Sequence, residues 1–371
     1  MKIKLNSLFI GLALLSCVQQ AASQVTNLGV APAHNQFVLY WPAGSPTNNN
    51  YILQSATNLA APNWTTEKYP VPVTASTVSN TTPAKFFRLI YTNPPAGMAL
   101  IPAGWFTMGD PLDGEGDAIP TNVYVSAFFM DTNLVDLSVW GAVYTYATTF
   151  NGYGFDDAGT GKAATHPVQT VNWYDCVKWC NARSQEAGLT PVYYTDAGLT
   201  QVYKTGDVTP YVNWAASGYR WPTEAEWEKA GRGGLSGRRF PWGNLISEGQ
   251  ANYYGATNDY SYDYGPNGYN AIGSIGGTSP ATSPVGSFDV NGYGLYDMAA
   301  NVFEWCWDWY GTPYGQPSNT TPTGPVGPLS DRVLRGGSWG SLASLARCAF
   351  RDYNVPDFAS NYVGFRCVRG L

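Results

Sequence analysis

The sequence has 371 residues, enough for about two domains. Hydrophobic residues make up 44% of it and aromatic residues 15%, which excludes a disordered chain, because disordered chains are poor in aromatic residues. Charged residues are only 12%, and 20 basic against 26 acidic side chains give a net charge of −6. Because no basic stripe is present, nucleic acid is not an expected partner.

Residues 1–24 have the pattern of a secretory signal peptide. Lys2 and Lys4 precede the apolar run Leu8–Leu15, which is too short to span a bilayer, and Ala21–Ser23 offer a cleavage site for a signal peptidase. We therefore expect a secreted or periplasmic bacterial protein without a transmembrane segment. The alternative is a lipoprotein, because Leu14–Cys17 resembles a bacterial lipobox in which Cys17 carries a lipid anchor.

Residues 25–95 are expected to form a small all-β module. Strands are predicted at Phe37–Trp41, Tyr51–Gln54 and Lys85–Tyr91, where aromatic and branched residues are frequent, and Gly44–Asn50 is a turn cluster. The module weakly resembles fibronectin-like modules of secreted bacterial proteins. Because it carries no catalytic constellation, we expect a spacer or attachment role.

Residues 96–371 are expected to form an α+β domain with much irregular structure, since the chain has 41 glycines and 26 prolines. Helices are predicted at Asp136–Thr148, Trp173–Ala187 and Pro222–Ala230. The third begins with a capping-box signature, Thr223 followed by Glu226. The glycines expected to end the second and third helices are Gly188 and Gly231.

Nine motifs in this domain occur in the order found in one family. They are Ile101–Gly109, His166–Trp173, Arg220–Glu228, Phe240–Gly243, Ser283–Gly286, Asn291–Met298, Asn301–Trp305, Arg335–Trp339 and Val363–Cys367. Together they resemble the sulfatase-modifying factor family, whose founding members are formylglycine-generating enzymes. The resemblance covers about three quarters of the chain. It implies a C-type-lectin-like fold with little regular secondary structure.

The resemblance also implies an activity, the oxidation of a sulfatase cysteine to formylglycine with oxygen and Cu(I). The family holds copper with two thiolates, three residues after the motif serine and five further on, which correspond here to Ser341 and Ala346 after Ser338. A hydroxyl is hard and protonated at neutral pH, so it does not replace a soft thiolate. Copper binding is therefore not expected, and whether the domain is an enzyme or a pseudoenzyme stays open.

A related branch of the family forms carbon–sulfur bonds with iron held by three histidines. This sequence has only His34 and His166, which excludes that chemistry, and His166 is expected to be structural.

Five cysteines remain after Cys17, so at least one is a free thiol or pairs between chains. The resemblance implies a disulfide between Cys180 and Cys367. Cys348 matches a family disulfide position whose usual partner is replaced by glycine here, and its pairing with Cys176 or Cys306 stays open. Cys176 and Cys180 lie four residues apart on a predicted helix, where a core role is favoured over a soft-metal pair.

Structural Ca²⁺ is the cofactor that the resemblance still supports. The first site has four implied ligands, the side chains of Asp297 and Glu304 and the carbonyls of Ala300 and Val302. A second site would use Asn252 and the Tyr253 carbonyl, with an acid that the sequence does not identify in the Asp259–Asp263 loop. The alternative is that Asp297 and Glu304 form buried pairs or caps.

Three functions follow from these observations. The first is an exported non-oxidase domain that binds or scaffolds a peptide or glycan ligand, possibly a sulfatase. The second is an oxidase with a rearranged thiol site, for which Cys348 is the cysteine close to Ser338 in sequence. The third is a hydrolase using carboxylates. The candidate carboxylates are Glu304, Asp308 and Asp352.

Two departures from the family pattern, Phe303 and Leu134–Asp136, indicate drift in its binding groove. Exposed aromatic residues such as Trp307, Tyr310 and Trp339 are candidates for lining a ligand groove, although core packing is favoured in so aromatic a chain.

Overall fold

The structure is a computed structural model that describes residues 94–274, 281–312, 314 and 322–371 in full, and the backbone of six strands between residues 29 and 91. The chain divides into two compact units, the first made of Met1–Pro95 with Pro102–Gly104 and the second of Ala96–Ile101 with Trp105–Leu371. The expected signal peptide, Cys17 and the turn cluster Gly44–Asn50 lie outside the described residues. Among the described helices, none is long and apolar enough to cross a membrane.

The first unit contains two antiparallel sheets of three strands each, in the orders β1-β2-β5 and β4-β3-β6. The strands are β1 (Gly29–Ala33), β2 (Gln36–Tyr40), β3 (Tyr51–Ala56), β4 (Thr65–Lys68), β5 (Ala75–Ser79) and β6 (Phe86–Tyr91). Three of them, β2, β3 and β6, confirm the strands predicted from the sequence.

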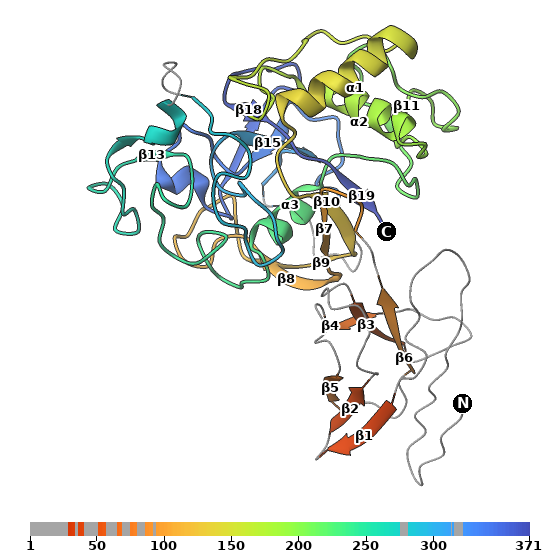
Figure 1. Ribbon diagram of the computed structural model, residues 1–371, viewed down its shortest axis with the longest axis vertical. Coiled ribbons are helices and arrows are strands. Elements are labelled where there is room, and N and C mark those ends of the chain that lie inside the picture. The colour runs from red at the N-terminus through yellow and green to blue at the C-terminus, as the bar shows by residue number, and fades with distance from the viewer. Residues whose placement is uncertain are drawn as a thin grey trace. The chain divides into compact units, whose positions relative to one another are not determined.

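One sheet of the second unit joins its two ends. The strand β10 (Phe128–Asp131) pairs antiparallel with β7 (Met98–Ile101) on one side and with β19 (Val368–Gly370) on the other, so Phe128 lies opposite both Ile101 and Gly370. Figure 1 shows the three strands together, with the C-terminus at β19. The C-terminal segment is therefore part of the core sheet.

A second sheet has four strands in the order β17-β16-β15-β18, with β15 and β18 parallel. They are β15 (Phe303–Trp309), β16 (Arg332–Arg335), β17 (Arg351–Asn354) and β18 (Val363–Gly364). The remaining short elements are β8 (Gly104–Met108), β9 (Thr121–Val125), β11 (Tyr193–Tyr194), β12 (Tyr211–Val212), β13 (Tyr254–Gly255), β14 (Gly268–Tyr269), η1 (Ala271–Ser274) and η2 (Ala343–Ala346). Short strands and long connections confirm the expected α+β class with much irregular structure.

The three predicted helices are confirmed as α1 (Leu137–Phe150), α2 (Trp173–Glu186) and α3 (Glu224–Gly231). Asp136 caps α1 by accepting a hydrogen bond from the Val139 amide, and Thr223 and Glu226 form the predicted capping box of α3.

The glycines expected at the helix ends lie where α2 and α3 end. Gly188 follows the last turn of α2 with φ of 67°, as a terminating glycine should. Gly231 is the last residue of α3, which confirms the expected end of that helix. The positive φ after α3 falls on Gly233, at 57°.

Aromatic rings fill the core between α1 and α2, which lie side by side in Figure 1. The Trp140 and Trp179 rings stack with their centroids 5.6 Å apart, and Phe365 meets both of them edge-on. Such pairs add to the free energy of burying large rings, by about 1 kcal/mol each.

Buried ion pairs attach α3 to the four-stranded sheet. Glu224 accepts two hydrogen bonds from Arg351, at 2.6 and 2.8 Å, and Glu228 pairs with both Arg232 and Arg335. All five side chains are at most 4% exposed. Because an unpaired buried charge is costly, these pairs fix the position of α3 against β16 and β17.

Candidate functional site

The loop after β16 begins with two positions at which only glycine fits. Gly336 and Gly337 have φ values of 93° and 78°. A Cβ on Gly336 would lie 3.0 Å from the Trp227 ring, and one on Gly337 would lie 3.0 Å from the Leu345 carbonyl oxygen. This tight turn delivers Ser338 into a buried position directly after the sheet.

Ser338 and Ser341 face each other in this loop. Their hydroxyl oxygens are 3.0 Å apart, and the Ser338 amide donates a 2.9 Å hydrogen bond to Ser341 Oγ. Both serines are about 5% exposed, and Ala346, at the end of η2, is fully buried. The two family thiolate positions therefore hold a hydroxyl engaged in hydrogen bonds and a methyl group, which do not fit Cu(I).

The five described cysteines lie elsewhere, and each is fully buried. Burial raises the pKa of Cys348 to about 11 and raises the pKa values of Cys176, Cys180 and Cys306 well above the usual range. Such thiols are protonated at neutral pH and have little reactivity. Cys348, the candidate for a rearranged site, donates its amide hydrogen to the Arg239 carbonyl, and its thiol neighbours Arg232 and Glu228.

Cys180 on α2 and Cys367 before β19 are brought together, with their sulfur atoms 3.5 Å apart. The two are in contact as thiols, and their oxidation to a disulfide stays a prediction. The neighbouring Cys176 contributes to the raised pKa of the Cys180 thiol. No group of three or more His, Cys, Asp or Glu side chains suited to a metal ion occurs in the described part of the chain.

At the first expected calcium site, Glu304 is bound by an arginine that the sequence analysis did not assign. Both carboxylate oxygens of Glu304 accept hydrogen bonds from Arg366, at 2.7 and 2.9 Å, and both side chains are at most 1% exposed. Arg366 also donates to the carbonyls of Tyr296 and Asp297. Its motif, Val363–Cys367, was visible in the sequence, but the pairing needs the parallel contact of β15 with β18.

Asp297 is the other expected carboxylate ligand, and one of its oxygens has no partner among the described residues. Oδ2 accepts a 2.8 Å hydrogen bond from the Gly286 amide, whereas Oδ1 is buried without a hydrogen bond. Burial raises the pKa of Asp297 to about 6. A buried carboxylate oxygen without a hydrogen-bond partner suits a hard cation such as Ca²⁺, so Asp297 fits the ion. The charge of Glu304, in contrast, is already balanced by Arg366.

The loop that carries the expected carbonyl ligands is strained. Asp297, Ala300 and Asn301 have φ values of 53°, 65° and 66°, which is uncommon for residues other than glycine. The Ala300 amide donates to the Gly336 carbonyl, and Val302 is fully buried against Gly364. Backbone strain of this kind is often found at ligand-binding sites.

The second expected calcium site adjoins the first, because the Asn252 carbonyl accepts a hydrogen bond from the Asn301 amide. The Asn252 side chain is 1% exposed and donates to the Ala281 carbonyl. In the nearby acidic loop, Asp263 accepts hydrogen bonds from the Tyr253 hydroxyl and from the amides of Ala256 and Gly265. Asp263 therefore stabilises its own loop.

The other candidate residues serve the fold. His166 Nδ1 lies 3.0 Å from the Thr282 hydroxyl, and burial lowers its pKa, which bears out the structural role. Asp308 is fully buried and accepts hydrogen bonds from the Glu224 amide and the Tyr314 hydroxyl. Burial also raises the pKa of Asp352. Glu304 is held by Arg366, so the partners of both Glu304 and Asp308 lie within the protein's own framework.

Of the aromatic candidates, Trp339 lies at the loop surface. Its ring is 6.0 Å from that of Tyr269, which in turn meets Tyr254 edge-on at 4.8 Å across the β13–β14 pair. We call Tyr254, Tyr269 and Trp339 the Trp339 surface. The Ser341 carbonyl accepts a hydrogen bond from the Tyr254 amide, which places this surface beside the serine pair.

Trp307 and Tyr310 are engaged elsewhere. Trp307 packs against Trp173 and Tyr193, with centroids 5.2 and 5.4 Å away, and Tyr310 stacks on Tyr353 at 4.2 Å.

Comparison with known proteins agrees with this geometry. The chain matches the family model described as Sulfatase-modifying factor enzyme 1-like domain over residues 87–371. It is 33% identical over 292 residues to the formylglycine-generating enzyme of Bos taurus, and the aligned region covers 74% of this chain and 75% of that protein.

Two solved structures are similar to this chain. Treponema denticola variable protein 1 has a TM-score of 0.57 and 27% identity, covering 74% of this chain and 95% of its own. PvdO from Pseudomonas aeruginosa has a TM-score of 0.54 and 26% identity, with coverages of 74% and 94%. These similarities confirm both the family resemblance and the C-type-lectin-like fold expected from the sequence motifs.

Proposed function

This chain belongs to the sulfatase-modifying factor family, and we propose that it is an exported, non-oxidase member that binds a ligand instead of oxidising cysteine. One observation carries the proposal. The two positions at which the family holds copper have a hydrogen-bonded hydroxyl, Ser341, and a buried methyl group, Ala346. The five described thiols are all buried, and burial raises the pKa of four of them.

The Trp339 surface is the proposed ligand site. It lies beside the serine pair, and Tyr269 is 48% exposed. Trp339 is oriented by a 3.1 Å hydrogen bond from its indole nitrogen to the Asn361 carbonyl. Fixed aromatic rings give contact area at little cost in conformational entropy, which is why they dominate binding sites.

The neighbours of this surface favour a glycan over a peptide. Asn361, which is exposed next to Trp339, carries an uncharged amide that pairs with hydroxyl-rich ligands, whereas a charged peptide would need compensating charge. A peptide ligand, including a sulfatase segment, is the other outcome of the test.

Calcium is proposed as a structural ion at the first site. The proposal is supported by the buried Asp297 Oδ1, which has no hydrogen-bond partner, and by the strained loop of residues 297–301. Calcium bound there would neutralise Asp297. Arg366 already does so for Glu304.

Copper binding and thiol counting test the proposal against the oxidase. The purified exported protein is titrated with Cu(I), and its thiols are counted in the native and denatured states. We expect no thiol-dependent copper binding and no reactive thiol in the native state. Tight binding of copper through two thiols, or conversion of the cysteine in a sulfatase peptide to formylglycine, would overturn the proposal.

Ligand binding is tested with purified oligosaccharides and with the same sulfatase peptide, followed by tryptophan fluorescence and calorimetry. Trp339→Ala should abolish binding. The matched control is Trp214→Ala, which removes a tryptophan that is 46% exposed and packs on Trp307. Binding that survives Trp339→Ala would refute this surface as the site.

A further inference from the structure

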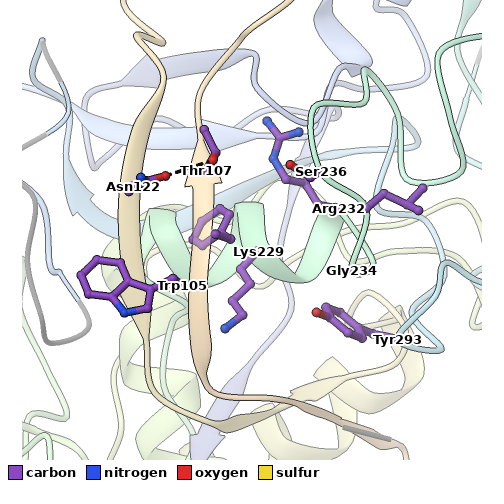
Figure 2. Close-up of a pocket in the computed structure, with 10 residues that line it drawn as sticks. Trp105, Thr107, Asn122, Lys229, Arg232, Gly234, Ser236 and Tyr293 are labelled. Atoms are coloured by element: carbon purple, nitrogen blue, oxygen red, sulfur yellow. Dashed lines mark hydrogen bonds between the residues drawn. The ribbon is translucent and has the colours of Figure 1, made fainter. Parts of the chain in front are cut away.

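An open cavity of about 360 Å³ lies beside the β8–β9 pair, at the lower end of the size range of small-molecule sites. The two strands form one wall, and the end of α3 with the loop that follows it forms much of the other. Figure 2 shows Trp105, Thr107 and Asn122 on the strands, with Ser236 and Tyr293 across from them. The cavity shares no residue with the Trp339 surface, so it is a separate candidate site whatever that surface binds.

The alternation of side chains along the two strands decides which residues reach this wall. Met108 on β8 and Val123 and Val125 on β9 are at most 3% exposed and belong to the core. Because successive side chains of a strand point to opposite faces, the residues between them point away from the core. Trp105 and Asn122 are accordingly exposed, Trp105 by 57%.

Two contacts between the strands fix this outer face. The Trp105 and Tyr124 rings meet edge-on with their centroids 5.6 Å apart, and the Thr107 hydroxyl donates a 3.0 Å hydrogen bond to Asn122 Oδ1. No residue that the structure describes accepts a hydrogen bond from the Asn122 amide nitrogen. The face therefore presents an oriented indole ring and an unused amide donor, so little conformational entropy is lost when a ligand binds.

The charged side chains of the cavity are engaged within the protein. Arg232 donates to Glu228 and to the carbonyls of Gly109 and Arg238, and Lys229 also has a partner in the protein. None of the described residues that line the cavity carries a carboxylate. Neither an anionic nor a cationic ligand would find an unpaired opposite charge here, so a neutral ligand is favoured.

The remaining groups fit a neutral sugar ring. A hexopyranose with equatorial hydroxyls has apolar C–H faces that stack on an indole, and its hydroxyls form hydrogen bonds around the edge of the ring. Trp105 supplies the indole, Asn122 supplies a donor, and Ser236, an exposed residue of the opposite wall, supplies a hydroxyl. A purely apolar ligand would cover these polar groups without pairing them, which is unfavourable.

We propose that this cavity binds one neutral hexopyranose unit of a glycan, stacked on Trp105 and hydrogen-bonded by Asn122. Because no carboxylate is found among its described lining residues, the cavity lacks the oxygen ligands that Ca²⁺ prefers. Sugar binding here is therefore independent of the ion proposed at Asp297. The site adds to the Trp339 surface and is tested separately from it.

Titration with cellobiose, a disaccharide of equatorial hexopyranose units, tests the proposal on the full protein. Calorimetry gives the affinity, and the indole ¹⁵N–¹H signal of Trp105, assigned by its absence in Trp105→Ala, reports the place of binding. The titration is repeated on Trp339→Ala, in which the Trp339 surface no longer contributes. We expect saturable binding of one cellobiose to Trp339→Ala with a shift of the Trp105 signal. No binding to this variant, or binding without that shift, would overturn the proposal.

Two variants in the Trp339→Ala background separate the aromatic contact from the polar one. Trp105→Ala should weaken cellobiose binding by about tenfold, because the stacking surface is lost. Asn122→Ala leaves the ring in place and should weaken it by about fivefold, the effect of one hydrogen bond. Both side chains are exposed, so the variants should fold, and Trp214→Ala is the matched control with unchanged affinity. Affinity that survives Trp105→Ala would place the sugar outside this cavity.

Two further ligands and a chelator test the class of ligand. Sorbitol has the hydroxyls of a hexose without the ring and should not bind, whereas 4-methylphenol has an apolar ring without the sugar hydroxyls and should not displace cellobiose. A chelator of Ca²⁺ should leave the affinity of Trp339→Ala unchanged. Displacement by 4-methylphenol, or loss of binding with the chelator, would contradict a metal-independent sugar site.

The same titrations distinguish the cavity from the proposed ligand site. If wild-type binding is lost in Trp339→Ala and unaffected by Trp105→Ala, the cavity proposal fails and the Trp339 surface stands. If binding is weakened by Trp105→Ala and unaffected by Trp339→Ala, the cavity proposal stands and the Trp339 surface fails.

Discussion

The ion-paired framework around α3 and the loop after β16 adjoin each other, yet they keep the family pattern to different degrees. In the framework, Glu224, Glu228 and Glu304 are paired with arginines and buried. In the loop, the glycine turn is intact, but Ser341 and Ala346 occupy the positions of the family's thiolates.

The difference separates what holds the fold from what performs the family reaction. Removing one partner of a buried ion pair leaves an uncompensated charge, so the framework tolerates little change. A thiol exchanged for a hydroxyl or a methyl group costs much less, so the loss of the copper ligands that we propose would leave the fold in place.

The largest expected effect is a gain of copper binding in the loop. Ser341→Cys combined with Ala346→Cys should bind one equivalent of Cu(I) through two thiols, because both positions would again supply soft ligands. Copper titration with a chromogenic chelator measures this. Ser341→Cys alone is the control and should bind far more weakly. A folded double variant that binds no copper would show that the loop does not have the family geometry.

In the framework, Glu228→Ala should lower the free energy of unfolding by about 3–5 kcal/mol, because Arg232 and Arg335 lose a buried partner together. Urea unfolding measures the change. The control is Glu186→Ala at the exposed end of α2, with an expected change within about 0.5 kcal/mol. Equal effects of the two substitutions would contradict the framework role.

The pH dependence of stability tests a carboxyl in the same framework. Burial raises the pKa of Asp308 to about 8, so the folded state keeps a proton that the unfolded state releases above about pH 4. The free energy of unfolding should therefore fall as pH rises between those values, by up to about 1.4 kcal/mol per pH unit. Urea midpoints across this range measure it, and Asp308→Asn should flatten the curve. If the variant keeps the same pH dependence, that dependence comes from other titrating groups and not from Asp308.

Calcium should have a moderate effect, because Arg366 already neutralises Glu304. We expect added Ca²⁺ to raise the melting temperature by about 2–4 °C, corresponding to about 1 kcal/mol, and a chelator to reverse the shift. Differential scanning calorimetry measures it, with Mg²⁺ as the control ion. Asp297→Ala should abolish the response, and a response that persists would place the ion elsewhere.

The smallest expected effect on stability is that of Trp339→Ala, because this ring lies at the loop surface. The free energy of unfolding should change by less than about 1 kcal/mol. Trp305→Ala, which empties a fully buried position of β15, should cost about 3–5 kcal/mol. The pair is compared by urea unfolding, and similar losses would mean that Trp339 belongs to the core.

Local signals in the sequence were sufficient for the helices. Asp136 and Thr223 define helix starts through hydrogen bonds within three residues, and a sequence pattern contains that information. The ion pairs that hold α3 were not predictable in this way, because Arg335 and Arg351 are distant from this helix in sequence. At the candidate site, the order of the motifs alone was sufficient to show that Ser341 and Ala346 stand where the family has thiols.

The sequence by itself determined the family, the α+β class, the main helices and the replacement of the copper thiolates, because ordered motifs and caps are local patterns. Only the tertiary structure decided that Arg366 binds Glu304 and that Cys180 meets Cys367. Each of these depends on segments that are far apart in the chain. The pKa of a side chain and its partner are set by what folding buries around it, which no local pattern specifies.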